Sequence, residues 1–471
     1  MVRHTTFRNP YPGMEVNVAG SALVHGLEKR HPRLAAEFTG LFSHVTDRGP
    51  RSIVGVGAKF RIQSQLINGA LIIRLLNDGV VEKEASFPST GTSTYFEHLF
   101  LGMSAFFDEV RSFLVEHHEL PPTMVMLGGW QCVSQPEWVG EPLVFTIPRI
   151  TCWLDEEEWR ICHFLEGGEG ELTDNDLLGM LPGFSPTVVP RVVQKQDVPG
   201  CREYVDTLVD LITELSAEAS DKVVICREVK FSLKKELSPV HLLRLVAPKQ
   251  MKNYEYMFRW SGGDAWVGIS PETLVRKNGA KVVVEPMAGT RKGSDAQDKW
   301  SRYRDELLSD DKERVEHETA ARMFYENLGT VCQPDSLEVL QSRGVVDFGY
   351  VQHLKSIVAG TVKPGVNIFR VLASVYPPAT IWGKPVLLSG ERIRNYERIE
   401  RGFFTGGLGY VTLDDHANLA LAIRTARLCG NEVHVYAGSG IVKASDPYQE
   451  WLETSNKMAP FLQSEVFDGS P

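Results

Sequence analysis

The chain has 471 residues, of which 43% are hydrophobic and 23% charged, and its 50 basic and 60 acidic residues leave a formal net charge of −10 at pH 7. Because this charge repels phosphate groups, we expect neither a nucleic acid nor an anionic membrane as a partner. The seven cysteines lack metal-site spacing, the first residues lack the apolar run of a secretory signal, and no stretch reaches the roughly 20 apolar residues of a membrane span, so a cytoplasmic protein with reduced thiols is expected.

The first part of the chain is expected to consist mainly of short strands. Apolar runs such as Ala70–Leu76 and Thr123–Gly129 are separated by glycine and proline, a pattern typical of strands and turns. No motif with recognisable chemistry occurs there. The segment Asp174–Gln196 has three prolines and no clear period, so we interpret it as a linker or as a long surface connection within one domain.

A helix followed by a strand is predicted next. Tyr204, Leu208 and Leu215 recur at helical spacing, and the run Lys222–Phe231 is apolar enough for a buried strand. Alternation along this strand would place the Lys222 amine beside apolar neighbours.

Two segments rich in helix formers carry paired glutamates. Glu313 and Glu316 lie three residues apart, as do Glu450 and Glu453, so each pair shares one face of its helix. Four carboxylates on two helices would suit a hard divalent cation, because Mg²⁺ takes oxygen ligands. Glutamates at this spacing are more often a solvated face that pairs with neighbouring lysines and arginines, so both interpretations stay open.

Residues near the second glutamate pair indicate anion binding. Gly438 and Gly440 lie in a glycine-rich run whose backbone N–H groups can approach an anion closely. Arg424 lies in an apolar strand, where it either pairs at a sheet edge or clamps a carboxylate with two hydrogen bonds. Lys457 follows Glu453 by one helical turn. This combination predicts a site for Mg²⁺ and a small polycarboxylate.

Nine short motifs follow one another along the second part of the chain. They are Lys222-Val-Val-Ile-Cys-Arg, Val267-Gly-Ile-Ser-Pro-Glu-Thr-Leu-Val, Glu285-Pro-Met-Ala-Gly-Thr-Arg, Glu313-Arg-Val-Glu-His, Val351-Gln-His-Leu-Lys-Ser, Arg401-Gly-Phe-Phe-Thr-Gly-Gly-Leu-Gly-Tyr, Ala422-Ile-Arg-Thr, Ala437-Gly-Ser-Gly-Ile-Val and Glu450-Trp-Leu-Glu-Thr. In this order they resemble the chorismate-utilising enzyme family, which comprises anthranilate, aminodeoxychorismate, isochorismate and salicylate synthases. A single motif is a weak signal, whereas the ordered series is specific.

The resemblance implies a fold and a division of the chain. The fold is of the α/β (α+β) class, with two packed antiparallel β-sheets flanked by helices and the site in the cleft. We expect a single large domain over residues 1–471, in which residues 1–195 form a divergent N-terminal part and residues 200–465 form the chorismate-binding catalytic core.

The resemblance also implies roles for individual residues. Glu316 and Glu453 would bind Mg²⁺ directly, and Glu313 and Glu450 would lie beside them and act through water. The metal would bind the ring carboxylate of chorismate, and Glu272 matches the general acid. The other implied positions are His353 at the catalytic ring site and, for the rest of the substrate, Gly289, Thr290, Phe404, Arg424, Gly438, Gly440 and Lys457.

Members of the family differ in the nucleophile that attacks C2 of chorismate. In one group it is ammonia from a glutaminase partner, and in the other it is water, which needs a base at pH 7. Members that use water resemble this chain in carrying a lysine at the position of Lys222, fifty residues before Glu272. The resemblance therefore implies Lys222 as the base and no glutaminase subunit. The alternative is a solvated lysine at a strand edge.

The two catalytic roles require opposite changes in pKa. Lys222 acts as a base only when it is neutral, so its pKa must fall from about 10.4 to roughly 7–8. Burial and a nearby Mg²⁺ would both lower it. Glu272 must stay protonated so that the C4 hydroxyl leaves as water, and its pKa should therefore be raised.

Two features favour a salicylate synthase. Thr380 aligns with a position where salicylate synthases carry threonine and isochorismate synthases more often carry alanine, and residues 350–356 look like the salicylate-forming branch. We expect a Mg²⁺-dependent monomer that converts chorismate through isochorismate to salicylate and pyruvate, for siderophore or other secondary metabolism. The alternatives are an isochorismate synthase without lyase activity, an anthranilate or aminodeoxyisochorismate synthase, and a non-catalytic chorismate-binding relative.

Two positions depart from the family's pattern. Trp382 stands where most relatives have a small residue, so it would crowd its loop or cover the substrate. Phe404 replaces the tyrosine of many relatives, which removes one hydroxyl contact. These departures motivate the non-catalytic alternative, which would bind chorismate tightly without turnover.

Overall fold

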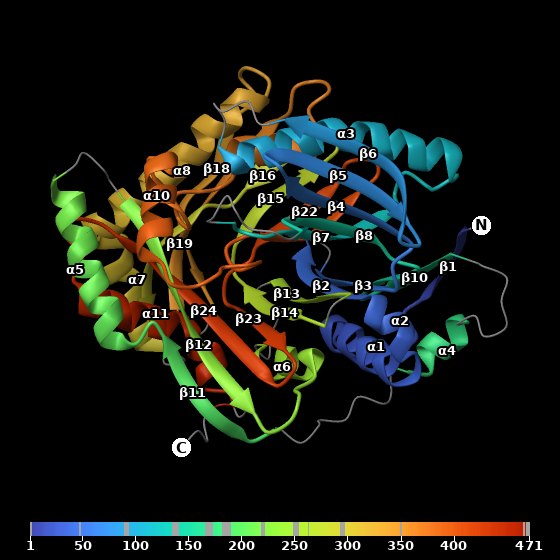
Figure 1. The fold of residues 1–471 in the computed structure, drawn as a ribbon, viewed down its shortest axis with the longest axis horizontal. Coiled ribbons are helices and arrows are strands. Elements are labelled where there is room, and N and C mark those ends of the chain that lie inside the picture. The colour runs from blue at the N-terminus through green and yellow to red at the C-terminus, as the bar shows by residue number, and fades with distance from the viewer. Residues whose placement is uncertain are drawn as a thin grey trace.

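Two large antiparallel sheets with helices on their outer faces make up the protein (Figure 1). The structure is a computed structural model, and it describes residues 2–46, 49–88, 94–133, 141–164, 173–180, 190–217, 222–247, 254–261, 263–292, 297–348, 351–464 and 467. Tyr350, the first residue of one motif used above, lies outside the described residues.

Each sheet has 12 strands in the described part of the chain. In spatial order the first sheet contains β1 (Val2–Arg8), β10 (Glu158–Phe164), β9 (Ile150–Asp155), β3 (Gly49–Val56), β2 (Phe38–Thr46), β13 (Tyr254–Trp260), β14 (Ala265–Ser270), β23 (Thr425–Cys429), β24 (Glu432–Ile441), β12 (Lys222–Leu233) and β11 (Val192–Val198), with β20 (Gly383–Lys384) paired to β12. The second contains β17 (Met287–Lys292), β19 (Val351–Thr361), β16 (Lys281–Val284), β15 (Thr273–Asn278), β22 (Ala417–Leu421), β21 (Gly407–Thr412), β7 (Val125–Trp130), β8 (Leu143–Ile147), β4 (Phe60–Ile67), β5 (Ala70–Asn77) and β6 (Val80–Pro88), with β18 (Glu338–Asp347) paired to β19.

The helices lie on the outer faces of the sheets. They are α1 (Val16–Arg30), α2 (Pro32–Glu37), α3 (Tyr95–His117), α4 (Asp174–Leu178), α5 (Cys201–Ala217), α6 (Pro239–Val246), α7 (Gln297–Ser309), α8 (Asp311–Val331), α9 (Ile368–Val375), α10 (Val386–Tyr396) and α11 (Pro447–Leu462). α3 packs on β5 and α9 packs on α3, whereas α1, α6 and α11 pack on β3, β14 and β24 of the first sheet (Figure 1). None of the helices described is long and apolar enough to cross a membrane.

Alternating burial along the strands explains why these sequences form sheets. β19 alternates between partly and fully buried residues along its whole length, and β4 and β5 do so over most of theirs. Successive side chains of a strand point to opposite faces, so one face of each strand packs into the core. The strands predicted at Ala70–Leu76, Thr123–Gly129 and Lys222–Phe231 are confirmed as β5, β7 and β12, and the helix containing Tyr204 is confirmed as α5.

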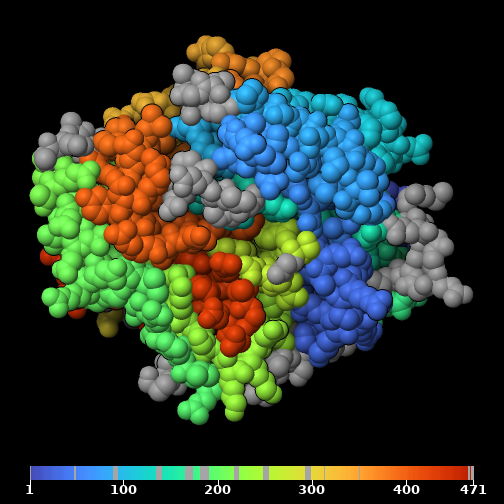
Figure 2. Space-filling view, viewed as in Figure 1, coloured from blue at the N-terminus to red at the C-terminus, as the bar shows by residue number. Residues whose placement is uncertain are grey.

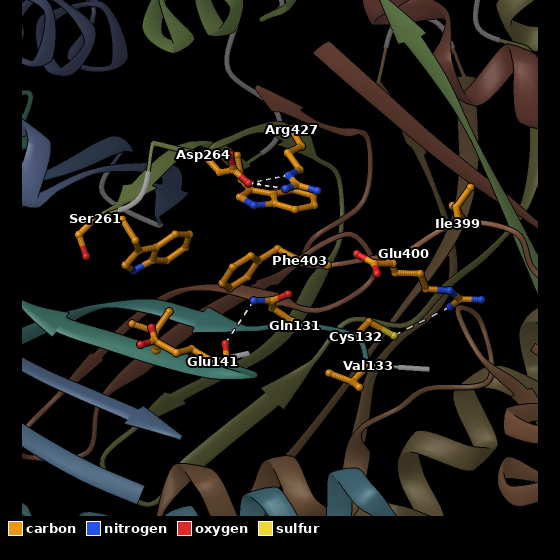
Figure 3. Close-up of a pocket in the computed structure, with 15 residues that line it drawn as sticks. Gln131, Cys132, Val133, Glu141, Ser261, Asp264, Ile399, Glu400, Phe403 and Arg427 are labelled. Atoms are coloured by element: carbon orange, nitrogen blue, oxygen red, sulfur yellow. Dashed lines mark hydrogen bonds and ion pairs between the residues drawn. The ribbon is translucent and has the colours of Figure 1, made fainter. Parts of the chain in front are cut away.

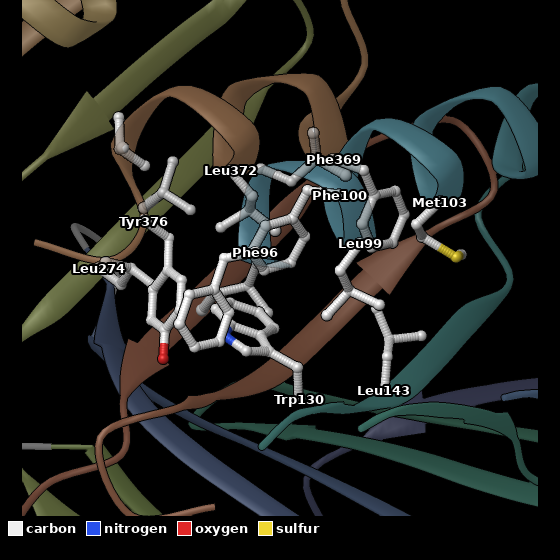
Figure 4. Packing of buried hydrophobic residues seen from close by; sticks show 14 of the residues in the cluster. Phe96, Leu99, Phe100, Met103, Trp130, Leu143, Leu274, Phe369, Leu372 and Tyr376 are labelled. Carbon is white, nitrogen blue, oxygen red and sulfur yellow. The ribbon is translucent and has the colours of Figure 1, made fainter. Parts of the chain in front are cut away.

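Buried apolar side chains form three clusters. One lies between the second sheet and helices α3 and α9, where Phe96, Phe100, Trp130 and Tyr376 meet edge to face (Figure 4). Another lies beneath α1, α6 and α11 against the first sheet. The third lies between the two sheets and includes Phe42. Burial of this apolar surface, with added edge-to-face attraction between rings, holds the layers together.

Strands from both ends of the chain occupy the same sheets. β2 pairs with β13 in the first sheet, and β7 pairs with β21 in the second. Light-blue N-terminal and orange C-terminal segments also adjoin on one face of the molecule (Figure 2). The boundary expected near residue 195 stays a prediction.

The segment Asp174–Gln196, interpreted as a linker or a surface connection, is only partly described. It contains α4 and the start of β11, and β11 pairs with β12. Residues 181–189 lie outside the described residues.

Candidate active site

Lys222 begins β12 beside the glycine-rich end of β24. In the antiparallel register, Val224 lies opposite Gly440 and Cys226 lies opposite Gly438. A Cβ atom at Gly440 would lie only 2.3 Å from Lys222 Cε. The lysine side chain therefore occupies the space that glycine leaves open, and a larger residue at position 440 would displace it.

The Lys222 amine faces helix α8. Its Nζ donates a hydrogen bond of 2.6 Å to Glu316 Oε1, and the two side chains are 17% and 39% exposed. The helix starts after Asp310, whose side chain accepts a hydrogen bond of 3.0 Å from the Glu313 N–H and so caps it. The amine thus lies between two elements of the fold, and not in bulk solvent as the strand-edge alternative requires.

Helix α11 brings a second lysine towards the same strand. Asp446 caps this helix at its N-terminus. One helical turn separates Glu453 and Lys457, and Lys457 Nζ lies 2.7 Å from Glu453 Oε1. The same amine donates a hydrogen bond of 2.9 Å to the carbonyl oxygen of Gly438. Lys457 therefore joins α11 to the glycine-rich end of β24.

The lysines and glutamates form one group of interacting charges. The Lys457 ammonium lowers the pKa of Glu453, and Lys222 acts in the same direction. Burial disfavours the charge of Lys457, but Glu453, Glu316 and Glu450 outweigh this effect and raise its pKa. The glutamate pairs predicted from helical spacing are thus close enough for their charges to interact across the two helices.

A chain of hydrogen bonds joins Arg424 to strand β17. His353 Nε2 accepts from an Arg424 N–H at 2.9 Å, and His353 Nδ1 lies 3.1 Å from both the Gly289 carbonyl oxygen and Thr290 Oγ1. Because a guanidinium only donates, Nδ1 carries the proton of the ring. Burial and the Arg424 charge lower the pKa of His353 to about 3, so the ring is neutral.

Glu272 supplies the buried carboxyl group. It follows β14, and the residue is only 5% exposed. Burial raises the pKa of Glu272 to about 8, although a hydrogen bond from the Met287 backbone and the Arg424 charge act in the opposite direction. The group is therefore protonated at pH 7, as the acid role requires. Burial also lowers the pKa of Arg424 to about 10, which leaves its guanidinium charged at pH 7.

The glutamates offer suitable donor atoms for Mg²⁺ without forming a closed cage. Among the described residues, no three histidine, cysteine, aspartate or glutamate side chains converge closely enough to hold a metal ion. Glu316 is paired with Lys222, and Glu453 with Lys457. Mg²⁺ commonly binds one or two carboxylates and takes its other oxygens from water and substrate, so Glu316 and Glu453 fit such an ion.

Arg291 holds Glu313 in place, a role that was not predicted from the sequence. Arg291 Nη1 lies 2.8 Å from Glu313 Oε1 and its other terminal nitrogen pairs with Asp310. The Thr290 N–H also donates to Glu313, at 3.2 Å. Arg291 is the last residue of the motif that starts at Glu285, and this position is the signal that could have identified it.

Among the described residues, no contact joins Thr380 or Phe404 to the lysines and glutamates of the site. The Thr380 hydroxyl is buried and has no hydrogen-bond partner among the residues described. It lines a small cavity together with Ala320 and Phe324 of α8. Phe404 is 2% exposed, and its ring stacks on Tyr436 with centroids 5.4 Å apart.

Trp382 packs into the core, and the expectation that it crowds its loop or covers the substrate stays a prediction. Its residue is 5% exposed, and Nε1 donates a hydrogen bond of 2.8 Å to the Val386 carbonyl oxygen. The indole meets Phe96 edge to face at 5.3 Å, and the missing side chain of Gly390 leaves room for it. Burial against an aromatic ring stabilises the indole in this position.

Comparisons with known proteins agree with the order of the motifs. The family model described as chorismate binding enzyme matches residues 181–463. Anthranilate synthase component 1 from Streptomyces coelicolor is 34% identical over 256 residues, which are 53% of this chain and 50% of that protein. The chain spans about half the length of the curated relatives it matches.

Solved structures with the same fold include an isochorismate synthase and an anthranilate synthase component I. The menaquinone-specific isochorismate synthase from Escherichia coli has a TM-score of 0.70 and 19% identity, covering 98% of this chain and 94% of that one. Anthranilate synthase component I from Streptococcus pneumoniae has a TM-score of 0.68 and 21% identity, covering 88% and 92%. At such identities the likeness establishes the fold alone, and the expected pair of antiparallel sheets flanked by helices is confirmed.

Proposed function

Since the chain belongs to the family of chorismate binding enzymes, we propose that it is a Mg²⁺-dependent salicylate synthase, which converts chorismate through isochorismate to salicylate and pyruvate. One observation carries this proposal, namely that Glu316, which pairs with Lys222, and the buried acid Glu272 both interact with the charge of Lys457. The Lys222 amine lies 2.6 Å from Glu316, and burial raises the pKa of Glu272 to about 8. A base for water and an acid for the departing hydroxyl are the two groups that the first step needs.

In the first step, Lys222 accepts a proton from a water molecule whose oxygen bonds to C2 of chorismate. The ring double bonds shift, and the C4 hydroxyl takes the proton of Glu272 and leaves as water. Lys222 gains one proton and Glu272 loses one, so the step is balanced.

Arg424 and Lys457 are the two cations proposed to bind the carboxylates of the substrate. Arg424 is charged at pH 7 and its partner His353 is neutral, so the guanidinium charge is available to an anion. Lys457 lies beside the glycine-rich backbone of β24. Mg²⁺, when bound by Glu316 and Glu453, would supply positive charge next to the ring carboxylate.

In the second step, bound isochorismate loses pyruvate. The hydrogen on C2 passes to the methylene carbon of the enolpyruvyl group, the C3–O bond breaks, and the ring becomes aromatic as salicylate. This transfer needs no protein base, so the site has only to hold a reactive conformer. The assignment of this step rests on the threonine at position 380.

An isochorismate synthase that stops after the first step is the second candidate. The Thr380 hydroxyl has no partner among the described residues, and no contact described there links it to Lys222 or Glu272. The menaquinone-specific isochorismate synthase from Escherichia coli shares the fold. A third possibility follows from the anthranilate synthase relatives, but the lysine at position 222 favours water over ammonia, and the proposal includes no glutaminase subunit.

The products formed from chorismate test the proposal. Purified protein with chorismate and MgCl₂ should form salicylate and pyruvate in equal amounts, measured by chromatography with fluorescence detection. Isochorismate that accumulates without salicylate would establish the second candidate. Anthranilate formed from chorismate and ammonia would exclude the water mechanism.

Replacement of Lys222 tests the proposed base. Lys222→Ala should lower the rate of chorismate consumption by roughly 10²–10⁴-fold, the usual contribution of a positioned base. Chorismate binding, measured by calorimetry, should change little. Lys384→Ala is the matched control, since Lys384 lies opposite Lys222 in β20 with an exposed side chain and should be dispensable. Full activity of the Lys222 variant would remove this residue from the base role.

A further inference from the structure

A second cavity lies beside the start of β14 and beside β23 (Figure 3). Glu272 follows the other end of β14, and Arg424 precedes β23. The volume of the cavity is about 340 Å³, which suits a small ligand. Asp264, which lines the cavity, precedes β14, whereas Glu272 follows it. A strand of this length rises roughly 20 Å, so the cavity is separate from the proposed chorismate site.

One wall of the cavity is aromatic. Trp260 stacks on Phe403 with centroids 4.5 Å apart and an interplanar angle of 7°. Trp266 meets Phe403 edge-on, with centroids 5.6 Å apart. In Figure 3 the Phe403 ring lies between Gln131 and Asp264, which also line the cavity. Trp260 is also stacked by Phe258, with centroids 5.6 Å apart, so it presents its edge to the cavity. The edge of an aromatic ring is positive and attracts the face of a flat ligand ring.

The charges around the cavity leave it acidic. Glu141 and Glu400 both line it, and neither forms an ion pair with the residues described. Arg427, which lines it too, is paired with an aspartate at 2.5 Å. Arg61 does not line the cavity, but it donates a hydrogen bond of 3.0 Å to the hydroxyl of Ser261, which does. Two carboxylates thus remain to attract a cation from solvent.

The loop that carries Phe403 is held in place by hydrogen bonds of a buried arginine. Arg401 is fully buried, its charge is neutralised by Glu397 at 2.8 Å, and it donates to the carbonyl oxygens of Ile381 and Val224 at 2.8 Å each. These bonds fix the loop from which Phe403 extends. A site with fixed walls loses little conformational entropy when a ligand binds.

We propose that this cavity binds a small molecule with a flat aromatic ring and a positively charged amine, independently of chorismate. The ring would lie along the wall formed by Trp260 and Phe403. The amine would lie towards Glu141 or Glu400, which line opposite sides of the cavity in Figure 3 and each favour a cation.

Calorimetry with two probes that share one ring tests the ligand class. Tryptamine carries an ammonium group, and indole-3-propionic acid carries a carboxylate on a chain of similar length. Tryptamine should bind with a dissociation constant below about 1 mM and at least about tenfold more tightly than the acid. No measurable tryptamine binding, or equal binding of the two probes, would overturn the proposal.

Variants locate the bound amine. Replacing both Glu141→Gln and Glu400→Gln should weaken tryptamine binding about tenfold and leave chorismate turnover unchanged. The matched control is Glu203→Gln, an exposed glutamate on α5 whose loss should have no effect. Lys222→Ala should bind tryptamine as tightly as the unaltered protein. Unchanged affinity of the double variant, or lost affinity in Lys222→Ala, would show that the probe binds elsewhere and would overturn the assignment.

Discussion

Lys222 reaches Glu316 because position 440 has no side chain. Strand pairing brings Gly440 next to the lysine stem, and a Cβ atom there would collide with Lys222 Cε. The atom that would be struck belongs to the flexible end of a long side chain. A small side chain at position 440 would therefore move the Lys222 amine with little loss of folding stability. Gly440 is thus needed to position the amine and is not needed to stabilise the sheet.

The variant Gly440→Ala tests this dependence. Displacement of the amine by about 1 Å should lower the rate of chorismate consumption by roughly 10²-fold, because proton transfer needs the reacting atoms in place. The melting temperature should stay close to that of the unaltered protein. Gly200→Ala is the control, since nothing lies within 4 Å of a Cβ atom at that position. Normal turnover by Gly440→Ala would refute the steric argument.

Glu272 predicts a pH dependence of stability. Its pKa is about 8 in the folded protein, compared with an ordinary value of 4.5, so the folded state keeps a proton that the unfolded state loses. The stabilisation is complete below pH 4.5 and is lost as pH rises through 8. Relative to Glu272→Gln, the free energy of unfolding should fall by about 1.4 kcal/mol per pH unit between these values.

Denaturant titrations of both proteins at pH 5 to 9 measure this difference. The difference in unfolding free energy should decline with pH and become level above about pH 8. A difference that stays constant over the whole range would mean that Glu272 is ionised in the folded protein at pH 7, and the acid role would then fail.

At the scale of elements, helix α11 is held on the first sheet by one buried arginine. Arg227 of β12 is 1% exposed and donates hydrogen bonds of 2.7 Å to Thr454 Oγ1 and to Ser455 Oγ. Its guanidinium carbon also lies 3.5 Å from the centroid of the Trp451 ring. These contacts lie between the predicted site residues along the helix, so they set the rotation that turns its glutamates and lysine towards β24.

The variant Arg227→Met tests the control of helix orientation. Thr454 and Ser455 would lose a buried hydrogen-bond partner, which should destabilise the protein by about 1–3 kcal/mol. It should also weaken Mn²⁺ binding, counted by electron paramagnetic resonance as a substitute for Mg²⁺. Arg392→Met is the matched control, since Arg392 is equally buried but pairs with Glu214 on α5. Both variants should melt earlier, and only Arg227→Met should lose metal affinity; equal losses would indicate a general structural effect.

At the scale of the whole molecule, each sheet depends on strands that are far apart in sequence. β13 lies between β2 and β14, and β21 lies between β7 and β22. Removal of the first 195 residues would leave β13 and β21 with open edges. Such edges expose unpaired backbone groups and apolar faces, which favours aggregation over folding.

Expression of residues 196–471 alone tests whether the core is separable. We expect a fragment that elutes as aggregate in size-exclusion chromatography and shows no cooperative melting by circular dichroism. Co-expression with residues 1–195 should restore soluble protein. A fragment that melts cooperatively and consumes chorismate would instead establish residues 200–465 as an independent domain.

Much of the site could be predicted from local sequence patterns. The spacing of Glu313 with Glu316 and of Glu450 with Glu453 predicts shared helix faces, and the structure has both pairs on helices. A raised pKa of Glu272 was expected from the acid role that the resemblance implies, and burial raises it in the structure. The surroundings of Trp382 could not be predicted, because no local pattern shows that Phe96, from a distant helix, offers it an apolar partner.

The sequence by itself determined the family, the two-sheet fold expected from it, and the residue types of the site, because motif order and helical or strand periodicity are properties of neighbouring residues. Only the tertiary structure decided that Lys222 meets Glu316, that Arg227 holds α11, and that Glu141 and Glu400, without ion pairs among the described residues, line an aromatic cavity. These contacts join residues that are far apart in the chain, and they arise from strand pairing and from packing of side chains, which no single segment encodes.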